Sequence, residues 1–276
     1  MKKNDAHFSS SKDPVTTEVQ TPLHENCDNS PRPTDDATLD ALFHGKLQLL
    51  QSRHGYRFSL DALLLAHFAT VKRGERLADL GTGNGVIPLV LTYLHEKIAV
   101  MGVEFQPGMV ERAQKNVKLN HLEKQIEIRR GDVRAIATIA AAESFDAVIC
   151  NPPFRKRSSG RISPNDERQI ARHEIHGELG SFIDAAAFLL RPKGRLALVY
   201  LADRAVDLLT SMRQARIEPK RIRLVHSFID AEASLVLVEG VKGGKSGVET
   251  MPPLIIYRSG DQYGEEVSAL IAGEKV

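Results

Sequence analysis

The chain is poor in sulfur and lacks the clustered residues that bind metals. Its 276 residues contain two cysteines, Cys27 and Cys150, and no tryptophan. One cysteine lies in a polar segment and the other ends an apolar run, so a disulfide framework is excluded. The ten histidines do not have metal-ligand spacing. We therefore predict neither a disulfide-rich fold nor a bound metal.

Long apolar runs are also absent. No stretch approaches the roughly 18 consecutive apolar residues that a membrane span needs, and Met1–Asp5 lacks the apolar core of a secretory signal. We expect a cytoplasmic location and no membrane partner. The net charge of +2 does not by itself indicate a nucleic-acid partner, because the local distribution of charge matters more.

Composition and hydrophobic periodicity divide the chain into three parts. Residues 1–36 are rich in Ser, Thr, Asp, Asn and Pro, which predicts a disordered tail. Residues 37–75 form a short N-terminal extension. Residues 76–276 are long enough for one large α/β domain.

The N-terminal extension contains two apolar stretches. Leu39, Leu42 and Phe43 recur at helix-like spacing, which predicts a helix there. Further along the chain, Ser59 is a candidate N-cap for a second, largely buried helix. We expect this second helix to lead directly into the core sheet.

A glycine-rich turn follows a short strand at residues 76–80. Its glycines allow a tight turn close to a ligand, and the helix beyond presents free N–H groups. A dinucleotide fingerprint would place its third glycine at Val86, one residue later than here. The G-x-G-x-G form resembles the first motif of Rossmann-like S-adenosylmethionine methyltransferases, with an ordinary strand-to-helix turn as the alternative. The candidate cofactor-binding residues are Asp79, Gly81, Thr82, Gly83 and Gly85.

The next two strands also end in groups suited to a nucleoside. The strand of residues 98–104 ends in Glu104, where a carboxylate would accept hydrogen bonds from ribose hydroxyls, and Phe105 follows it. The strand of residues 126–133 ends in Gly-Asp, where Asp132 would accept from an adenine amino group and Val133 would cover the ring. Asp132 could equally be only a turn former.

The fourth strand, residues 145–150, runs into Asn151-Pro152-Pro153-Phe154. The prolines lack N–H groups, so backbone carbonyls are left to accept hydrogen bonds from outside the chain. The Asn151 amide adds another acceptor, and Phe154 adds a stacking face. This combination suits a flat substrate with an amino group, although Asn and Pro are also common in plain turns. Because ligands bind beyond the carboxyl ends of parallel strands, we expect all four strand ends to form one site.

A basic run follows this tetrapeptide directly. Gly, Ser and Pro within the run indicate a loop beside the site. A solvated loop would explain the charge, but contacts with the phosphates of a nucleic acid explain both the charge and its position. The candidate RNA-binding residues are Arg155, Lys156, Arg157, Arg161, Arg168 and Arg172.

The last third of the chain completes the sheet. Helices are predicted at residues 179–190 and 206–216, and strands at 195–201, 221–226 and 234–240. The last two strands have no helix between them, which predicts an antiparallel hairpin on an otherwise mostly parallel sheet of seven strands with helices on both faces. A short edge piece at 255–257 and a terminal helix at 262–271 would follow.

From about Thr38 onward, the chain resembles the bacterial tRNA adenine-N6 methyltransferases that modify the adenine beside the anticodon of valine tRNA. The motifs that carry this resemblance are the segment 55–66, Asp79 to Gly85, Glu104 and the Asn-Pro-Pro-Phe tetrapeptide. It implies the class I methyltransferase fold, S-adenosylmethionine as cofactor and RNA as partner. It also implies that Arg57 to Asp61, within the extension 37–75, close over the methionine end of the cofactor.

One residue departs from the family pattern. In that family the tetrapeptide usually ends in Tyr, whereas here it ends in Phe154. The form that ends in Phe resembles that of ribosomal guanine-N2 methyltransferases, which keeps guanine open as the target. Protein glutamine methylation uses the same tetrapeptide, but with a larger helical N-terminal domain. DNA adenine methylation would need a separate target-recognition domain. A non-catalytic cofactor-binding or RNA-binding module is the alternative from another class, and intact Asn151, Gly81 and Glu104 argue against it.

Overall fold

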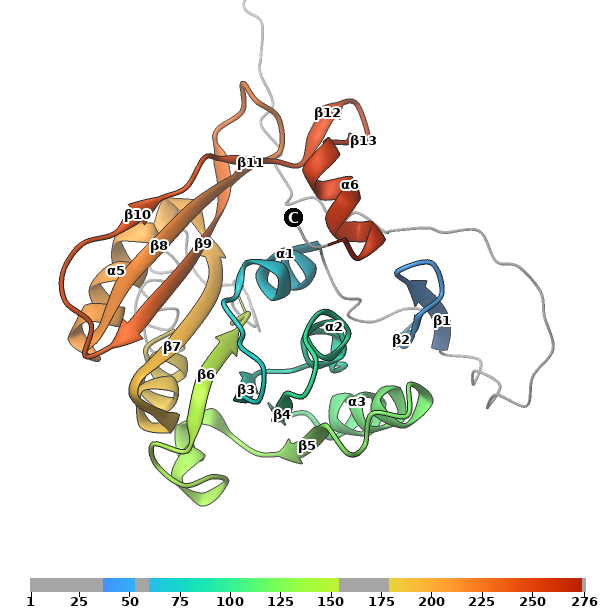
Figure 1. Cartoon of the computed structure of the whole chain (residues 1–276), viewed down its shortest axis with the longest axis vertical. Coiled ribbons are helices and arrows are strands. Elements are labelled where there is room, and N and C mark those ends of the chain that lie inside the picture. Colours follow the sequence, from blue (N-terminus) through green and yellow to red (C-terminus); the bar gives the residue numbers. More distant parts are fainter. Residues whose placement is uncertain (1–36, 53–59, 154–178, 275–276) are drawn as a thin grey trace, which may run out of the picture.

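The computed structural model describes residues 37–52, 60–153 and 179–274. Within these ranges, a nine-stranded sheet forms the centre of the molecule, with its longer strands in the order β8-β9-β7-β6-β3-β4-β5 (Figure 1). The two-residue strands β10 (Glu249–Thr250) and β11 (Leu254–Ile255) pair with β8. The seven longer strands are β3 (Arg76–Leu80), β4 (Ala99–Glu104), β5 (Ile126–Arg130), β6 (Phe145–Cys150), β7 (Leu190–Leu201), β8 (Ile217–His226) and β9 (Ala233–Lys242).

Strand directions confirm the predicted mixed sheet. β5, β4, β3, β6 and β7 are mutually parallel, whereas β9 runs antiparallel to both β7 and β8. β7 starts at Leu190, five residues before the predicted strand at 195–201, and its residue Lys193 has a positive φ of 67°. The pairing with β6 shifts register there, so the strand continues past the irregularity.

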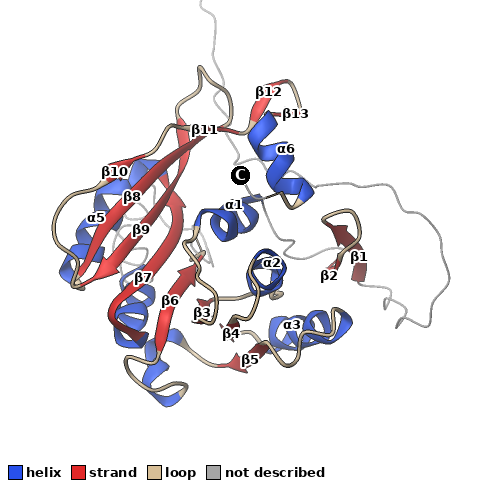
Figure 2. Cartoon of the chain, in the orientation of Figure 1, coloured by secondary structure: helices blue, strands red, loops and turns tan. Residues whose placement is uncertain are grey.

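Helices cover both faces of this sheet (Figure 2). One core lies under α1 (Leu60–Phe68), α2 (Val86–Leu94) and α3 (Pro107–Leu119), and the other under the helix of residues 179–189 and α5 (Ala205–Gln214). β6 shows how alternation feeds both cores, since Ala147 and Ile149 enter the first and Val148 and Cys150 the second. Strands buried on both faces explain the continuous apolar runs in the sequence.

The predicted helix at Leu39, Leu42 and Phe43 is wrong, because this segment forms a hairpin. β1 (Ala37–Leu42) pairs antiparallel with β2 (Leu47–Ser52). Phe43 and His44 have positive φ values of 54° and 56°, which no α-helix contains, and they turn the chain. Phe43 then stacks on Tyr93 of α2 with ring centroids 4.4 Å apart. The apparent helical spacing therefore reflects a strand followed by a buried turn residue.

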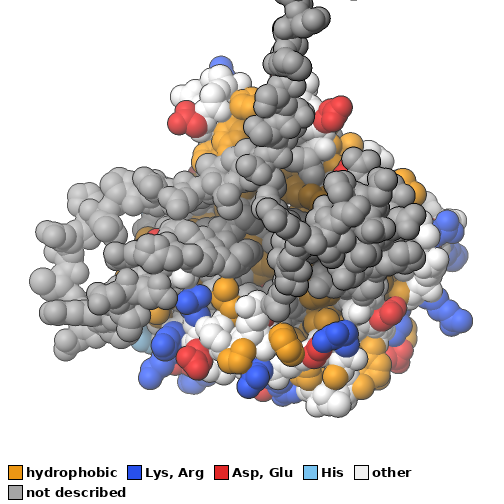
Figure 3. All heavy atoms as spheres, turned by 180° about the vertical axis from the view of Figure 1, so that it is seen from behind, with side chains coloured by type: hydrophobic (Ala, Val, Ile, Leu, Met, Phe, Trp, Pro, Cys, Tyr) orange, Lys and Arg blue, Asp and Glu red, His pale blue; other side chains and the backbone are white. Residues whose placement is uncertain are grey.

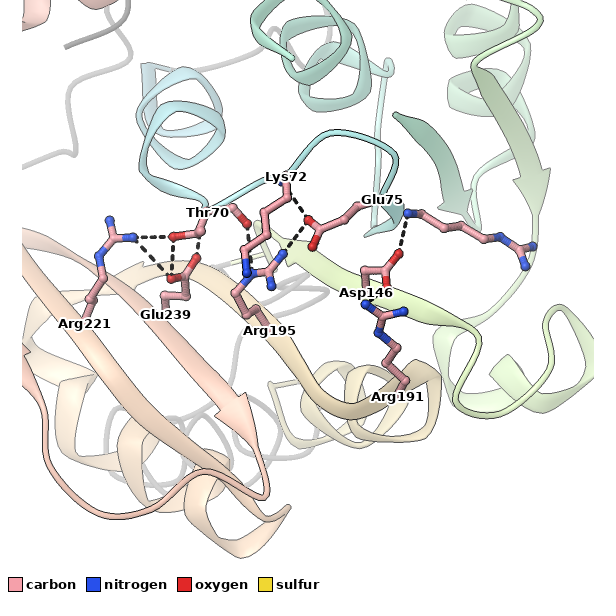
Figure 4. Close-up of polar contacts among 9 residues, drawn as sticks. Thr70, Lys72, Glu75, Asp146, Arg191, Arg195, Arg221 and Glu239 are labelled. Carbon is pink, nitrogen blue, oxygen red and sulfur yellow. Dashed lines mark hydrogen bonds and ion pairs between the residues drawn. The ribbon is translucent and has the colours of Figure 1, made fainter. Parts of the chain in front are cut away.

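A polar network fixes the segment between α1 and β3 to the sheet (Figure 4). Glu239 of β9 accepts from the backbone N–H and hydroxyl of Thr70 at 2.7 and 2.8 Å and pairs with Arg221 at 3.2 Å. Arg221 also donates to the Phe68 carbonyl, and Arg195 to that of Thr70, both at 3.0 Å. Cationic side chains thus bind the last carbonyl of α1 and a carbonyl just beyond it, as helix C-termini favour.

The C-terminal elements pack on α1. β12 (Tyr257–Ser259) and β13 (Gln262–Tyr263) form a small hairpin before α6 (Glu265–Ala272). The terminal helix therefore begins after Gly264, three residues later than predicted. His67 of α1 bonds to the backbone of Leu270, and burial lowers its pKa to about 4. None of the described helices is long and apolar enough to cross a membrane.

Two short 3-10 helices complete the described chain. η1 (Val133–Thr138) follows β5, and η2 (Ala202–Arg204) joins β7 to α5. Ser59, the predicted N-cap of α1, lies outside the described residues, as does the predicted tail 1–36.

Candidate functional site

Strand register brings the predicted site residues to one edge of the sheet. Leu80 of β3 lies opposite Val103 of β4 and Cys150 of β6, and Glu104 lies opposite Arg130 of β5. These strands are parallel, so the residues after them emerge side by side. The glycine turn, Glu104, Asp132 and Asn151 therefore share the carboxyl edge, as predicted.

Positive φ values shape the glycine turn. They are 75° at Gly81, 57° at Gly83 and 84° at Gly85. Residues with a Cβ atom rarely adopt such φ values. The N–H groups of Gly81 and Thr82 both donate to the Val103 carbonyl, at 2.9 and 3.0 Å. The turn is thereby tied to the end of β4.

The third glycine also makes room for a neighbouring helix. A Cβ at Gly85 would lie 3.3 Å from the Cβ of Ala113 in α3. Gly85 caps α2 at its N-terminus. Its lack of a side chain therefore allows α2, α3 and the turn to pack closely.

Glu104 holds the other side of the turn. It is 7% exposed, and its two carboxylate oxygens accept from the N–H groups of Gly83 at 3.0 Å and Gln106 at 2.8 Å. Each oxygen keeps a further lone pair, so this fixed carboxylate can still accept from hydroxyl groups. Phe105 follows with 55% of its surface exposed, which leaves an apolar ring at the same edge.

Asp79 is a buried carboxylate without compensation. It is 0% exposed, and neither oxygen has a hydrogen-bond partner within the described part of the chain. Burial raises the pKa of Asp79 to about 7, the Thr82 side chain opposes this shift, and the charge of Glu104 adds to it. The Thr82 hydroxyl lies nearby, but it too lacks a hydrogen bond of normal geometry among the described residues. Such an orphaned acceptor is typical of a site that binds a polar ligand.

Asp132 occupies the predicted place but is already engaged. Its carboxylate accepts from the backbone N–H of Arg134 at 2.9 Å and pairs with the guanidinium of the same residue. These contacts lower the pKa of Asp132, so it stays a charged acceptor. Val133 begins η1 and packs, partly buried, against the second core.

Asn151 leaves the end of β6 half-buried. Pro152 behind it is buried, and Pro153 is exposed. A partly exposed amide at this edge can bind a substrate group. The neighbouring Cys150 is fully buried, and burial raises the pKa of its thiol well above the usual value, which leaves it protonated and inert.

Several predicted residues cannot be placed. Arg57, Phe154 and the basic run that contains Arg155, Lys156, Arg157, Arg161, Arg168 and Arg172 lie outside the described residues. Asp61 is placed in the first turn of α1. On the described surface in Figure 3, Lys and Arg side chains are interspersed with Asp and Glu. Near the site, Arg129 and Arg134 are paired with Glu127 and Asp132.

Three asparagines, one in the glycine turn and two toward the end of α3, were missed by sequence reasoning. Asn84 lies inside the glycine turn and is 1% exposed, and Asn116 of α3 is 0% exposed. Asn120 follows one helical turn later. The available signal was a polar residue on the apolar stripe that contains Val110, Ala113 and Val117. In the described chain, no group of three or more His, Cys, Asp or Glu could hold a metal ion.

Comparison with known proteins gives a consistent result. A family model described as the methyltransferase small domain matches residues 60–215. The tRNA1(Val) (adenine(37)-N6)-methyltransferase of Porphyromonas gingivalis strain ATCC 33277 is 31% identical over 197 residues, which cover 70% of this chain and 76% of that protein. The protein of the same name from Tolumonas auensis is 28% identical over 180 residues, or 62% of this chain and 73% of its own length.

Solved structures share the fold. A crystal structure described as a predicted O-methyltransferase from Agrobacterium tumefaciens superposes with a TM-score of 0.64 at 24% identity, over 77% of this chain and 96% of that one. TrmN from Thermus thermophilus gives a TM-score of 0.50 at 21% identity, over 66% of this chain and 48% of its own. At these identities, the likeness concerns the arrangement of strands and helices.

Proposed function

The chain belongs to the methyltransferase small domain family, and we propose that it transfers a methyl group from S-adenosylmethionine to N6 of an adenine in tRNA. The observation that carries this proposal is the place of Asn151, half-buried after the end of β6 and beside the glycine turn that follows β3. The names of the relatives from P. gingivalis and T. auensis support adenine 37 of a valine tRNA as the target.

The residues present fit the cofactor. The turn at Gly81 to Gly85 admits close backbone contact, and the orphaned Asp79 carboxylate offers an acceptor for the methionine end. Glu104 would hold the ribose hydroxyls, while Phe105 and Val133 would cover the adenine ring that Asp132 binds. Closure of Arg57, Asp61 and the rest of 37–75 over the methionine end stays a prediction. S-adenosylmethionine supplies an electrophilic methyl group to this site.

The acceptor side is formed by the tetrapeptide. In this proposal, Asn151 Oδ1 and the Pro152 carbonyl accept the two hydrogens of the target amine. This holds the nitrogen toward the methyl group and stabilises the positive charge that develops on it. Neither group has to remove a proton before transfer, so no strong general base is required. Phe154 would stack on the target base, which leaves the stack most easily in an RNA loop.

The RNA partner accounts for the charge distribution. Arg129 and Arg134 near the site are already paired, and phosphate contacts are assigned to the basic run from Arg155 to Arg172, which follows the tetrapeptide directly. Such contacts make binding strongly dependent on salt. An enzyme that acts on tRNA works where tRNA is found, which supports a cytoplasmic location.

Identification of the product tests this proposal. Purified protein and S-adenosylmethionine are incubated in separate reactions with unmodified tRNA, rRNA or a protein extract. The nucleosides of the RNA samples and the amino acids of the protein sample are then analysed by mass spectrometry. We expect N6-methyladenosine in the tRNA sample. N2-methylguanosine in rRNA, or methylglutamine in protein, would overturn the assignment of the substrate, and no methyl transfer to any fraction would overturn that of an enzyme.

A further inference from the structure

Asn116 of α3 and Asn120, the residue that caps this helix at its C-terminus, make the hydrogen bonds that a neighbouring strand would make to β2. Asn120 Oδ1 accepts from the Gln48 N–H at 2.8 Å, and its Nδ2 donates to the Gln48 carbonyl at 2.7 Å. In the same way, Asn116 Oδ1 accepts from the Leu50 N–H at 2.6 Å, and its Nδ2 donates to the Leu50 carbonyl at 3.1 Å. The asparagines are four residues apart, so they lie on one face of the helix. They satisfy the edge of β2 that β1 does not pair.

Asn116 makes one contact that Asn120 does not. Its Nδ2 also donates to the carbonyl of Asn84, at 2.9 Å, inside the glycine turn. The same turn is held on its other side by Glu104 through the Gly83 N–H at 3.0 Å. Two buried side chains therefore fix the backbone of the turn: Glu104 binds the N–H of Gly83, and Asn116 binds the carbonyl of Asn84.

The Asn84 side chain strengthens this connection. Its Oδ1 accepts from the Val86 N–H at 3.3 Å, at the start of α2, and its Nδ2 donates to Gln51 at 3.4 Å. Gln51 in turn donates to Asp40 of β1. The hairpin and the turn are thus joined through both the backbone and the side chain of Asn84.

We propose that Asn116 is a positioning residue for cofactor binding, which couples the N-terminal hairpin to the glycine turn. β2 ends at Ser52, immediately before the segment that contains Arg57. The amide of Asn116 therefore joins the end of the anchored hairpin to the backbone of the glycine turn. This inference rests on the proposed function only in assigning the glycine turn to S-adenosylmethionine.

A matched pair of variants separates the positioning of the glycine turn by Asn116 from the mere attachment of β2 to α3, which Asn120 also provides. Asn116→Asp and Asn120→Asp each keep the shape of the side chain and replace one NH2 donor by oxygen. Each loses two donated bonds, but only Asn116→Asp loses the bond to the turn. A buried carbonyl left without its donor is unfavourable, and a carboxylate facing it adds repulsion.

Affinity for S-adenosylhomocysteine, measured by calorimetry, is the readout. We expect Asn116→Asp to raise the Kd by about tenfold and Asn120→Asp by less than about threefold, with comparable losses of Tm. The KM for tRNA should stay unchanged in both. Equal effects of the two variants on the Kd would reduce Asn116 to a docking residue and overturn the proposal. Because binding is measured without RNA, failure of the proposed substrate leaves this test intact.

Hydrogen exchange on the wild-type chain covers the case in which Asn116→Asp does not fold. Coupling is reciprocal, so a ligand that fixes the turn must also stabilise the hairpin. We expect S-adenosylhomocysteine to slow exchange of the Gln48 and Leu50 amides. Unchanged exchange at these amides, while those of Gly83 and Gly85 become protected, would contradict the coupling.

Discussion

At the scale of single residues, Asp79 shows the cost of keeping an acceptor ready for a ligand. Its pKa of about 7 means that the folded chain favours the neutral acid up to near-neutral pH. Above that pH, the chain contains a buried charge without a hydrogen bond among the described residues. Sites that bind ligands commonly retain such unfavourable groups.

Stability should therefore fall as pH rises. The folded-state pKa of about 7 exceeds the ordinary value of 3.8, so between these values the folded chain binds more protons than the unfolded one. Asp79→Asn removes this effect. We expect the variant to be more stable than wild type at pH 8, by at most about 4 kcal/mol in the free energy of unfolding, and equal to it near pH 4. Urea unfolding at both pH values measures the difference.

Asp132→Asn provides the matched control. The pKa of Asp132 is lowered by Arg134, so its charge stabilises the fold above the usual carboxyl range. Its replacement should cause a small loss of stability at pH 8. A gain of stability in Asp132→Asn, or a gain in Asp79→Asn that does not change with pH, would contradict these assignments.

At the scale of elements, α1 is fixed at its C-terminal end by the network of Glu239, Arg221 and Arg195. Glu239 is 4% exposed, and Arg221 also lies over the ring of Phe68, 4.5 Å from its centroid. The opposite end of α1 carries Asp61 in its first turn. The network therefore holds the helix that carries this predicted cofactor contact.

Removal of one partner from this network should be costly. Arg221→Ala leaves the Glu239 carboxylate buried with Thr70 alone, and we expect a loss of about 3 kcal/mol in the free energy of unfolding. The double variant Arg221→Ala with Glu239→Gln should recover part of this loss, because the uncompensated charge is gone. Denaturant titrations of all three proteins give the comparison. No recovery in the double variant would assign the cost to lost Arg221 packing.

At the scale of the whole molecule, the sheet and the positions of its strand ends could be predicted from sequence. The apolar runs that end in Asp79, Glu104 and Asn151 are local signals, and parallel strands must bring their ends to one edge. The family resemblance added the cofactor and the reaction, which periodicity alone does not give.

The remaining features depend on contacts distant in sequence. In the sequence, Asn116 is marked only as a polar residue on the apolar face of its helix, and its partner Leu50 in β2 lies 66 positions away. Thr70 and Glu239 are 169 residues apart, and no local pattern links them. Leu39, Leu42 and Phe43 have the spacing of a helix because Phe43, the turn residue after β1, packs on Tyr93 of α2.

The central claim is that Asn151 accepts the target amine while the other strand ends hold the cofactor. Single-turnover methyl transfer to tRNA by Asn151→Ala, with saturating S-adenosylmethionine, tests it most directly. We expect the rate to fall by at least about 100-fold, with the Kd for S-adenosylhomocysteine within about twofold of wild type because Glu104 and the glycine turn are unchanged. Methyl transfer by this variant at the wild-type rate would contradict the account.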